Sequence, residues 1–219
     1  MTPKQIISTL QPFVSEHRQA LIERISRERT RHITLAFEDI DKPHNISAVL
    51  RTAECLGIQD LHFIKNKNEY RVNPDITKGA AKWLTFHHHN GSASGVENIE
   101  HGLKYLRDNG YQVFATAVED NAQSIYEIPT DKKTVIVFGT EGTGISDETK
   151  ARVDGLVTIP MKGFTESFNL SVSAAIILTV LLSQKKESWF VSGEEREALI
   201  AEWYRRSVRE ADKILALKR

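Results

Sequence analysis

Short apolar runs alternate with amphipathic stretches through the middle of the chain. The runs predict strands near residues 33–38, 60–64, 112–118, 134–138 and 156–160. Apolar residues at helical spacing predict helices near residues 45–56, 95–109, 147–152 and 169–183. Strands that alternate with helices in this way are typical of an α/β domain with a mostly parallel sheet.

A polar cluster lies where a buried strand should pass into a buried helix. Residues 156–160 form the predicted strand and residues 172–182 are almost wholly apolar, so Ser167, Asn169 and Ser171 occupy the junction. Polar groups at such a place need hydrogen-bond partners or a ligand. Serine and asparagine are also ordinary helix caps. Taken alone, the junction therefore indicates either a binding site or a cap.

A second segment, residues 37–57, combines a strand end, a loop and a helix. Asn45 is a good N-cap and Gly57 is a good helix end. The apolar residues between them place Arg51 beside the predicted buried stripe. An arginine there either lays its stem along apolar surface or reaches for an anion. A solvated helix arginine is the ordinary alternative.

A third segment, residues 134–148, is a buried strand that runs into a glycine-rich loop. Such loops let a ligand approach the backbone closely. The spacing of Gly139, Gly142 and Gly144 matches neither the dinucleotide fingerprint nor the phosphate-binding loop, and no lysine follows Gly144. Glu141 would repel a polyphosphate but suits a cationic or hydroxyl-bearing partner. A nucleotide-dependent dehydrogenase or kinase is therefore a weak alternative.

Together these segments resemble the three motifs of the SpoU (SPOUT) family of RNA 2′-O-ribose methyltransferases, and within it the TrmH branch that acts on tRNA. The motifs occur in order as residues 42–48 with Arg51, residues 138–146, and residues 159–161 with residues 167–171. Residues 73–84 also resemble this branch, and the whole match spans about residues 33–183. Phe168 departs from the family, in which leucine is common at this place.

The resemblance implies an α/β fold with a mostly parallel sheet, a deep C-terminal trefoil knot and a homodimeric assembly. General folding rules would instead predict an ordinary doubly wound sheet, because knots are nearly absent from proteins. The implied cofactor is S-adenosylmethionine, held largely by main-chain groups of the knot and covered by apolar side chains. The residues expected against the cofactor are Thr116, Gly139, Ile159, Met161 and Phe168.

The implied reaction is attack by a ribose 2′-hydroxyl on a sulfonium methyl group, which requires alignment and removal of a weakly acidic proton. The family's proposed base corresponds to Arg51, although arginine is normally locked in its protonated form. Arg51 is therefore expected either to act as the base or to orient an RNA phosphate as a cation. By the same resemblance, Asn45 and Asn169 position Arg51 and the substrate, while Glu141 and Ser167 complete the hydrogen-bond network.

The favoured substrate within the family is guanosine 18 in the tRNA D-loop. Another tRNA position or a ribosomal RNA is the alternative, although a ribosomal enzyme would more often carry a folded N-terminal RNA-binding domain than the short segment here. A noncatalytic RNA-binding relative is a further alternative. Because the motif residues named above are all present, we favour an enzyme.

Charge divides the chain into a basic N-terminal helical arm (1–31), the methyltransferase domain (32–184) and a C-terminal helix (185–219). The formal net charge of the chain is zero. The N-terminal arm has six Lys/Arg and three Asp/Glu, the domain has fourteen and nineteen, and the C-terminal part has nine and seven. Positive ends favour RNA contact. An apolar stripe from Ile200 to Leu215 predicts that the helix packs inward with its arginines outward. The expected RNA-binding residues are Arg18, Arg24, Arg27, Arg29, Arg31, Arg205, Arg206, Arg209 and Lys213.

The remaining composition indicates a soluble cytoplasmic protein without metal. The single cysteine, Cys55, excludes an internal disulfide, suits a reducing compartment and is expected to fill core space. Residues 87–89 are three consecutive histidines, but adjacent side chains cannot all point to one metal ion, and no ligand cluster accompanies them. The sequence shows no leading apolar segment and no stretch long enough to span a bilayer.

Overall fold

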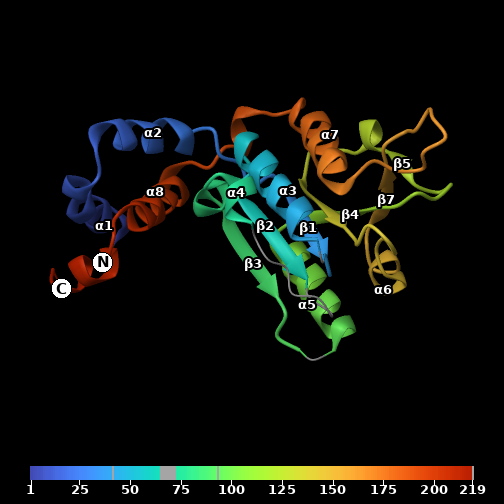
Figure 1. Cartoon of the computed structure of the whole chain (residues 1–219), viewed down its shortest axis with the longest axis horizontal. Helices are drawn as coiled ribbons and strands as arrows, with labels where there is room; N and C mark the ends of the chain where they lie inside the picture. Colours follow the sequence, from blue (N-terminus) through green and yellow to red (C-terminus); the bar gives the residue numbers. More distant parts are fainter. Residues whose placement is uncertain (41, 65–72, 93, 219) are drawn as a thin grey trace. The chain divides into compact units, whose positions relative to one another are not determined.

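The computed structural model describes residues 1–40, 42–64, 73–92 and 94–218. The chain divides into two units (Figure 1). Arg31–Lys186 form the larger unit, and Met1–Thr30 together with Glu187–Arg219 form the smaller one. No helix in the described part of the chain has both the length and the apolar character needed to cross a membrane.

The larger unit is built on a seven-stranded parallel sheet, counted over its described residues. The strand order is β3-β2-β1-β6-β4-β7-β5, and every neighbouring pair is parallel. The predicted α/β class with a mostly parallel sheet is confirmed. The strands are β1 (Ile33–Glu38), β2 (Asp60–Ile64), β3 (Thr85–His89), β4 (Tyr111–Thr116), β5 (Gln123–Ser124), β6 (Lys133–Phe138) and β7 (Gly155–Thr158).

Two strands escaped the sequence prediction for clear reasons. β3 carries three histidines and a threonine instead of an apolar run, and β5 has two residues. Helices α3 and α7 pack against each other, whereas α5 packs on β2, β3 and β4 and contacts α6. The helices of this unit are α3 (Pro43–Cys55), α4 (Pro74–Thr77), α5 (Gly95–Asp108), α6 (Asp147–Lys150) and α7 (Leu170–Leu182), with single turns η2 (Ala80–Trp83) and η3 (Ile125–Glu127).

The sheet is apolar on both faces because helices cover both. In β1, alternate side chains point to opposite faces. The Phe37 ring lies 5.3 Å from Phe63 and 6.1 Å from Phe138 on one face. Ala36 belongs to the opposite cluster, which includes Ile99 and Leu103 of α5. Burial on two faces explains the nearly continuous apolar runs from which the strands were predicted.

Helix α3 corrects two expectations from the sequence. It begins at Pro43 with Lys42 as the N-cap residue, so Asn45 is not the cap but a buried residue of the first turn. Proline favours the first helical position because its fixed φ suits the helix and it has no N–H to satisfy. Cys55 is exposed, not core filler, because it lies one turn beyond exposed Arg51 on the outer face of α3. Gly57 has a φ of 81° and ends the helix as predicted.

The smaller unit contains α1 (Pro3–Leu10), η1 (Gln11–Phe13), α2 (Glu16–Ser26), η4 (Glu187–Trp189), α8 (Gly193–Ser207) and α9 (Ala211–Ala216). Helix α1 packs on α8 and α9, and α2 packs on α8, so the two ends of the chain share one core. The expected single C-terminal helix is wrong. Val208 is extended and Glu210 has a φ of 57°, which separates α8 from α9.

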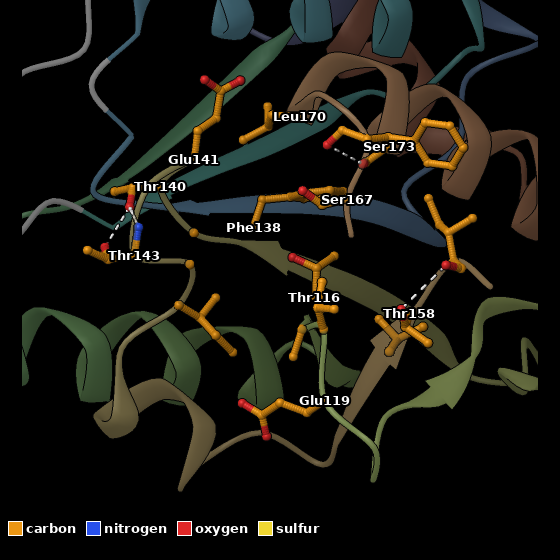
Figure 2. A pocket seen from close by; sticks show the side chains of 18 of the residues that line it. Thr116, Glu119, Phe138, Thr140, Glu141, Thr143, Thr158, Ser167, Leu170 and Ser173 are labelled. Carbon is orange, nitrogen blue, oxygen red and sulfur yellow. Dashed lines mark hydrogen bonds between the residues drawn. The ribbon is translucent and has the colours of Figure 1, made fainter. Parts of the chain in front are cut away.

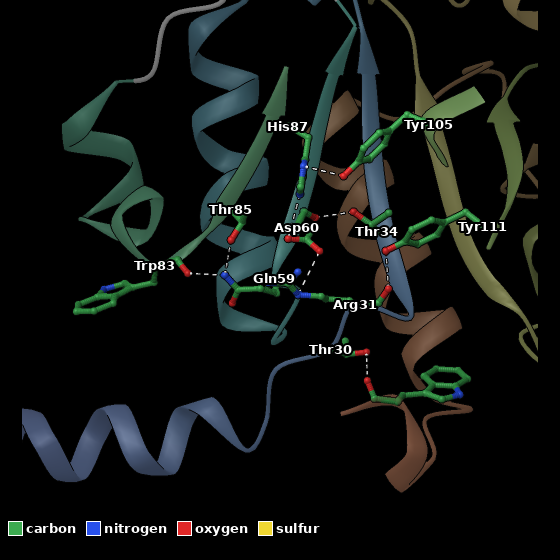
Figure 3. Close-up of polar contacts among 11 residues, drawn as sticks. Thr30, Arg31, Thr34, Gln59, Asp60, Trp83, Thr85, His87, Tyr105 and Tyr111 are labelled. Carbon is green, nitrogen blue, oxygen red and sulfur yellow. Dashed lines mark hydrogen bonds and ion pairs between the residues drawn. The ribbon is translucent and has the colours of Figure 1, made fainter. Parts of the chain in front are cut away.

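A polar cluster lies between α5 and the edge of the sheet formed by β2 and β3 (Figure 3). Asp60 Oδ1 lies 3.3 Å from His87 Nε2, and His87 Nδ1 lies 3.5 Å from the Tyr105 hydroxyl. His62 Nδ1 and His89 Nε2 are 3.3 Å apart. His88 stacks on Phe63 instead. The described residues contain no group of three or more potential ligands placed to hold a metal ion.

Burial makes two of these histidines poor bases. Desolvation, with the nearby imidazoles as a smaller cause, lowers the pKa of His62 to about 2 and that of His89 to about 4 from 6.5. His62 is 2% exposed and His89 is 4% exposed. The unfolded chain therefore binds more protons than the folded chain below pH 6.5. The stability that comes from keeping these imidazoles neutral is complete well above pH 6.5. It is lost as the pH falls, down to about 4 for His89 and about 2 for His62.

We predict that lowering the pH from 7.5 to 5.5 costs about 3 kcal/mol of unfolding free energy through these two histidines. Urea denaturation at both pH values measures the loss. His62→Phe removes one titrating group and should roughly halve this component, whereas His17→Asn, at an exposed position of α2, serves as the control. An unchanged pH dependence in His62→Phe would show that the buried imidazole does not carry the effect.

Candidate functional site

A cavity of about 630 Å³ opens at the carboxyl ends of β4, β6 and β7 (Figure 2). Its walls come from the loop after β4, the glycine-rich loop after β6, and the segment between β7 and α7. The loops after parallel strands converge at this edge of a sheet, which is where ligands of open α/β folds bind. Lining residues include Thr116, Glu119, Phe138, Gly139, Thr140, Glu141, Ile145, Lys150, Thr158, Ile159, Met161, Ser167, Phe168, Asn169 and Ser173.

The glycine-rich loop folds tightly back toward β6. Thr140 and Gly144 exchange backbone hydrogen bonds of 3.1 and 3.0 Å, and the Thr140 and Thr143 hydroxyl oxygens are 2.7 Å apart. A Cβ added at Gly139 would lie 2.1 Å from the carbonyl carbon and oxygen of Gly144. The close turn therefore requires glycine at position 139, and it fixes the place from which Glu141 projects.

Glu141 joins three distant segments of the chain. Its carboxylate accepts hydrogen bonds from Lys42 Nζ, Asn45 Nδ2 and Asn169 Nδ2, the last at 2.9 Å. Asn169 Nδ2 also donates to Asn45 Oδ1 at 3.2 Å. These contacts bring together the helix after β1, the loop after β6 and the start of α7.

Asn169 is a helix cap and a member of this network at once. Its Oδ1 accepts from the Ser171 backbone N–H at 2.9 Å, which caps α7, while its Nδ2 contacts Glu141. The cap and the site, which the sequence left as alternatives, are therefore both present. Because the two functions use opposite ends of one amide, the cap fixes the direction in which the amide donates.

The structure places the expected cofactor residues around the cavity. Thr116, Gly139, Ile159, Met161 and Phe168 all line it. Of the expected catalytic residues, Glu141, Ser167 and Asn169 also line it. Asn45 reaches the cavity through its contacts with two of them.

Arg51 is placed differently. Its side chain is exposed on α3 and is not a lining residue of the cavity. The described residues give it no hydrogen bond or ion pair. The buried stripe of α3 includes Ile46, Val49, Leu50 and Ala53, as expected, and Arg51, expected beside it, is exposed. An exposed guanidinium is available to an RNA phosphate.

Three charged residues at the site were missed by sequence reasoning. Lys42 contacts Glu141, and Glu119 forms an ion pair with Lys150 at 2.7 Å in the cavity wall. Lys42 lies three residues before Asn45, and its contact with Glu141 depends on the three-dimensional position of Glu141. Glu119 directly follows a predicted strand, which was the available signal, because strand ends of a parallel sheet converge.

The arginines expected to bind RNA fall into two groups. Arg18, Arg24, Arg27 and Arg209 are exposed, although Arg27 contacts Glu23 at 2.8 Å. Arg29 contradicts the expectation of outward arginines, because it is 1% exposed and its guanidinium lies 5.2 Å from the Trp203 ring centroid. A buried cation stacked on an aromatic ring stabilises the core of the smaller unit.

Three other arginines are half-buried beside carboxylates. Arg31 Nε lies 3.4 Å from Asp60, Arg205 lies 3.4 Å from Asp212, and Arg206 Nε donates to Glu202 at 2.9 Å. Lys213 is exposed and contacts Glu210 at 3.0 Å. Their charge is partly neutralised within the protein, so each contributes less to attracting a polyanion than a fully exposed arginine.

Comparison with known proteins places the site in a family context. The model of the SpoU rRNA Methylase family matches residues 32–179. A tRNA (guanosine(18)-2′-O)-methyltransferase of Borreliella burgdorferi is 34% identical over 206 residues, which cover 93% of this chain and 91% of that protein. The TrmH/SpoU tRNA modifying enzyme of Aquifex aeolicus aligns with a TM-score of 0.76 and 26% identity, covering 88% of this chain and 98% of that chain.

A more distant structure shares the fold alone. The AdoMet-bound rRNA methyltransferase of Sinorhizobium meliloti is 21% identical, with a TM-score of 0.60 over 72% of this chain and 59% of that chain. The fold of the seven-stranded domain is therefore shared with that protein at low sequence identity.

We predict that Gly139→Ala destabilises the protein by about 1–3 kcal/mol, because the added methyl group overlaps backbone that cannot move without opening the loop. Gly142→Ala is the matched control in the same loop, since a Cβ there has no atom within 4 Å. Urea unfolding of the two variants gives the comparison. Equal stabilities would mean that the loop does not hold this closed turn in solution.

Proposed function

Because its residues 32–179 match the family model, this chain belongs to the SpoU rRNA Methylase family, and we propose that it methylates the ribose 2′-hydroxyl of guanosine 18 in the tRNA D-loop. The relative from Borreliella burgdorferi carries that activity in its name and matches this chain along nearly its whole length. The observation that carries the proposal is the Glu141 network beside the cavity, which joins all three family motifs.

The cofactor we propose is S-adenosylmethionine, which supplies an electrophilic methyl group when bound. The cavity fits it in size and character. About 630 Å³ is ample for a nucleoside with an amino-acid arm. Ile159, Met161 and Phe168 offer apolar surface to a purine, and the backbone of the glycine-rich loop, which lines the cavity, can read its polar edge.

The network positions the substrate ribose. Glu141 accepts hydrogen bonds from three side chains, which restrain the direction of its carboxylate. We assign Asn45 and Asn169 to orienting the 2′-hydroxyl and nearby groups, and Ser167, exposed in the same wall, to completing the hydrogen bonds. Fixed donors and acceptors of this kind lower the barrier by holding reactants in a productive geometry.

We propose that Arg51 either removes the proton of the 2′-hydroxyl or orients an RNA phosphate. As a base it would have to lose its proton, which costs much free energy for a guanidinium in water. As a cation it would orient an RNA phosphate through charge-assisted hydrogen bonds. Its exposed position favours the second role, because water stabilises the charged form.

We also propose a homodimer. Phe164 is fully exposed, and Phe168 and Val172 are each 44% exposed, all within the segment that runs from the cavity into α7. Clustered apolar side chains on a surface are typical of an interface.

By family resemblance we infer further that the C-terminal part of the domain forms a deep trefoil knot and that the enzyme works on tRNA in the cytoplasm. The exposed Arg18, Arg24, Arg27 and Arg209 support contact with the tRNA backbone.

The proposed reaction is tested by methyl transfer from labelled S-adenosylmethionine to unmodified tRNA transcripts, followed by nuclease digestion and mass mapping. We expect one ribose methylation, at guanosine 18. A transcript with 2′-deoxyguanosine at that position is the control and should accept no methyl group. Methylation at another tRNA position or in ribosomal RNA would change the assigned substrate, and absence of transfer to any of these RNAs would contradict the enzymatic assignment.

Arg51→Ala should lower kcat by about 10²- to 10⁴-fold while the affinity for S-adenosylmethionine stays nearly unchanged, since Arg51 lies outside the cavity. Single-turnover methylation and equilibrium binding measure the two quantities. Cys55→Ala, one turn along the same exposed face, is the control. Substantial activity in Arg51→Lys would favour the cation role, because lysine keeps the charge. A strong loss of cofactor binding in Arg51→Ala would remove Arg51 from the catalytic assignment.

A further inference from the structure

An ion pair of opposite charges lies in the wall of the cavity. Glu119 follows β4 and Lys150 ends α6, and the two side chains meet at 2.7 Å while each remains about one third exposed. Both residues line the cavity. The hydrogen bond to Glu119 raises the pKa of Lys150, which is an ammonium at neutral pH in any case. Asp147 lies 3.7 Å from the same ammonium but is almost fully exposed, so water screens it.

Few charges face this cavity. Among the described residues that line it, the ionisable ones are Glu119, Glu141 and Lys150. Glu141 is already bound by Lys42, Asn45 and Asn169. Among the described lining residues, Glu119 and Lys150 are thus the charged groups that the Glu141 network does not use.

The cofactor proposed above carries charges that need such partners. Its amino-acid head bears an ammonium and a carboxylate on one carbon atom, and its sulfur is a cation. A carboxylate that enters a partly desolvated cavity must find a cation or N–H donors there, because an unpaired charge is costly away from water. Glu141 is offset by Lys42 and Glu119 by Lys150, so the wall offers paired charges to the amino-acid head rather than a net charge.

Building on the proposed function, we propose that the Glu119–Lys150 pair binds the amino-acid head of S-adenosylmethionine. Lys150 Nζ donates to the head's carboxylate, and the Glu119 carboxylate accepts from its ammonium. The adjacent ammonium and carboxylate of Lys150 and Glu119 thus complement the adjacent carboxylate and ammonium of the amino-acid head. Figure 2 shows Glu119 and Glu141 at opposite sides of the cavity, so the head is held away from the network that positions the RNA ribose.

The test compares two sulfides that differ in this head. S-Adenosylhomocysteine carries it, and 5′-methylthioadenosine lacks it. Competition against labelled S-adenosylmethionine gives both dissociation constants for the wild type and for Lys150→Met, Lys150→Arg, Glu119→Gln and Lys104→Met. Lys104 is the matched control because it forms an ion pair with Asp108 at 2.6 Å on α5, away from the lining residues.

Lys150→Met and Glu119→Gln should each weaken S-adenosylhomocysteine by about 10- to 100-fold, the range for loss of a charged hydrogen bond. Binding of 5′-methylthioadenosine should change less than about 2-fold, so the preference for the ligand with the head collapses. Lys150→Arg should retain most of that preference, and Lys104→Met should match the wild type. Thermal unfolding of each variant verifies that it is folded.

Other results would overturn the inference. Unchanged binding of S-adenosylhomocysteine in Lys150→Met would reduce the pair to a surface salt bridge. Equal weakening of both ligands would assign the pair to the nucleoside, for example with Glu119 accepting from ribose hydroxyls. Failure of the proposed function looks different, because the wild-type protein itself would then bind neither S-adenosylmethionine nor S-adenosylhomocysteine.

Discussion

The Glu141 carboxylate is the contact on which the candidate site depends. It accepts hydrogen bonds from Asn45, which is 96 residues earlier, and from Asn169, which is 28 residues later, and it also contacts Lys42. Charge-assisted hydrogen bonds are about twice as strong as neutral ones, so three of them can hold segments that no local structure connects. The tight turn at Gly139 and the amide of Asn169, fixed by its cap, set the position and direction of two of the partners.

This arrangement in turn requires the polarity of the sheet. All strand pairs are parallel, so the segments after β1, β4, β6 and β7 emerge at one edge. Packing of helices on both faces of the sheet supplies most of the hydrophobic stabilisation. The loops at that edge can therefore hold polar side chains that bind a ligand. The same architecture accommodates polar residues near the outer edge of the sheet, where the uncharged imidazoles of His62 and His89 are buried beneath α5.

The sequence was informative where the type of a residue largely determines its environment, as for apolar residues in buried strands. Apolar runs predicted five of the strands, and the resemblance carried by the three motifs predicted the family and most of the residues that line the cavity, although Arg51 lies outside it. Prediction failed where long-range packing decides. β3 is a strand because it pairs with β2 and because Tyr105 of α5 packs against His87 and His89. Arg29 is buried because Trp203 lies beneath its guanidinium. Cys55 lies on the exposed face of α3, next to the buried stripe on which it was expected. Neither the Lys42 contact nor the Glu119–Lys150 pair has a spacing that marks it in the sequence.

The charges around the cavity are paired, and this decides how the proposed cofactor is held. Among the described residues, the lining carboxylates Glu141 and Glu119 each contact one lysine, Lys42 and Lys150, so these four charges sum to zero. S-Adenosylmethionine would enter with one net positive charge, and the product left after methyl transfer would be neutral, because the sulfonium becomes a sulfide. The amino-acid head is the same in both molecules. Its contacts with Glu119 and Lys150 therefore hold the cofactor before and after the reaction, and a net charge of the wall contributes little to the difference between them.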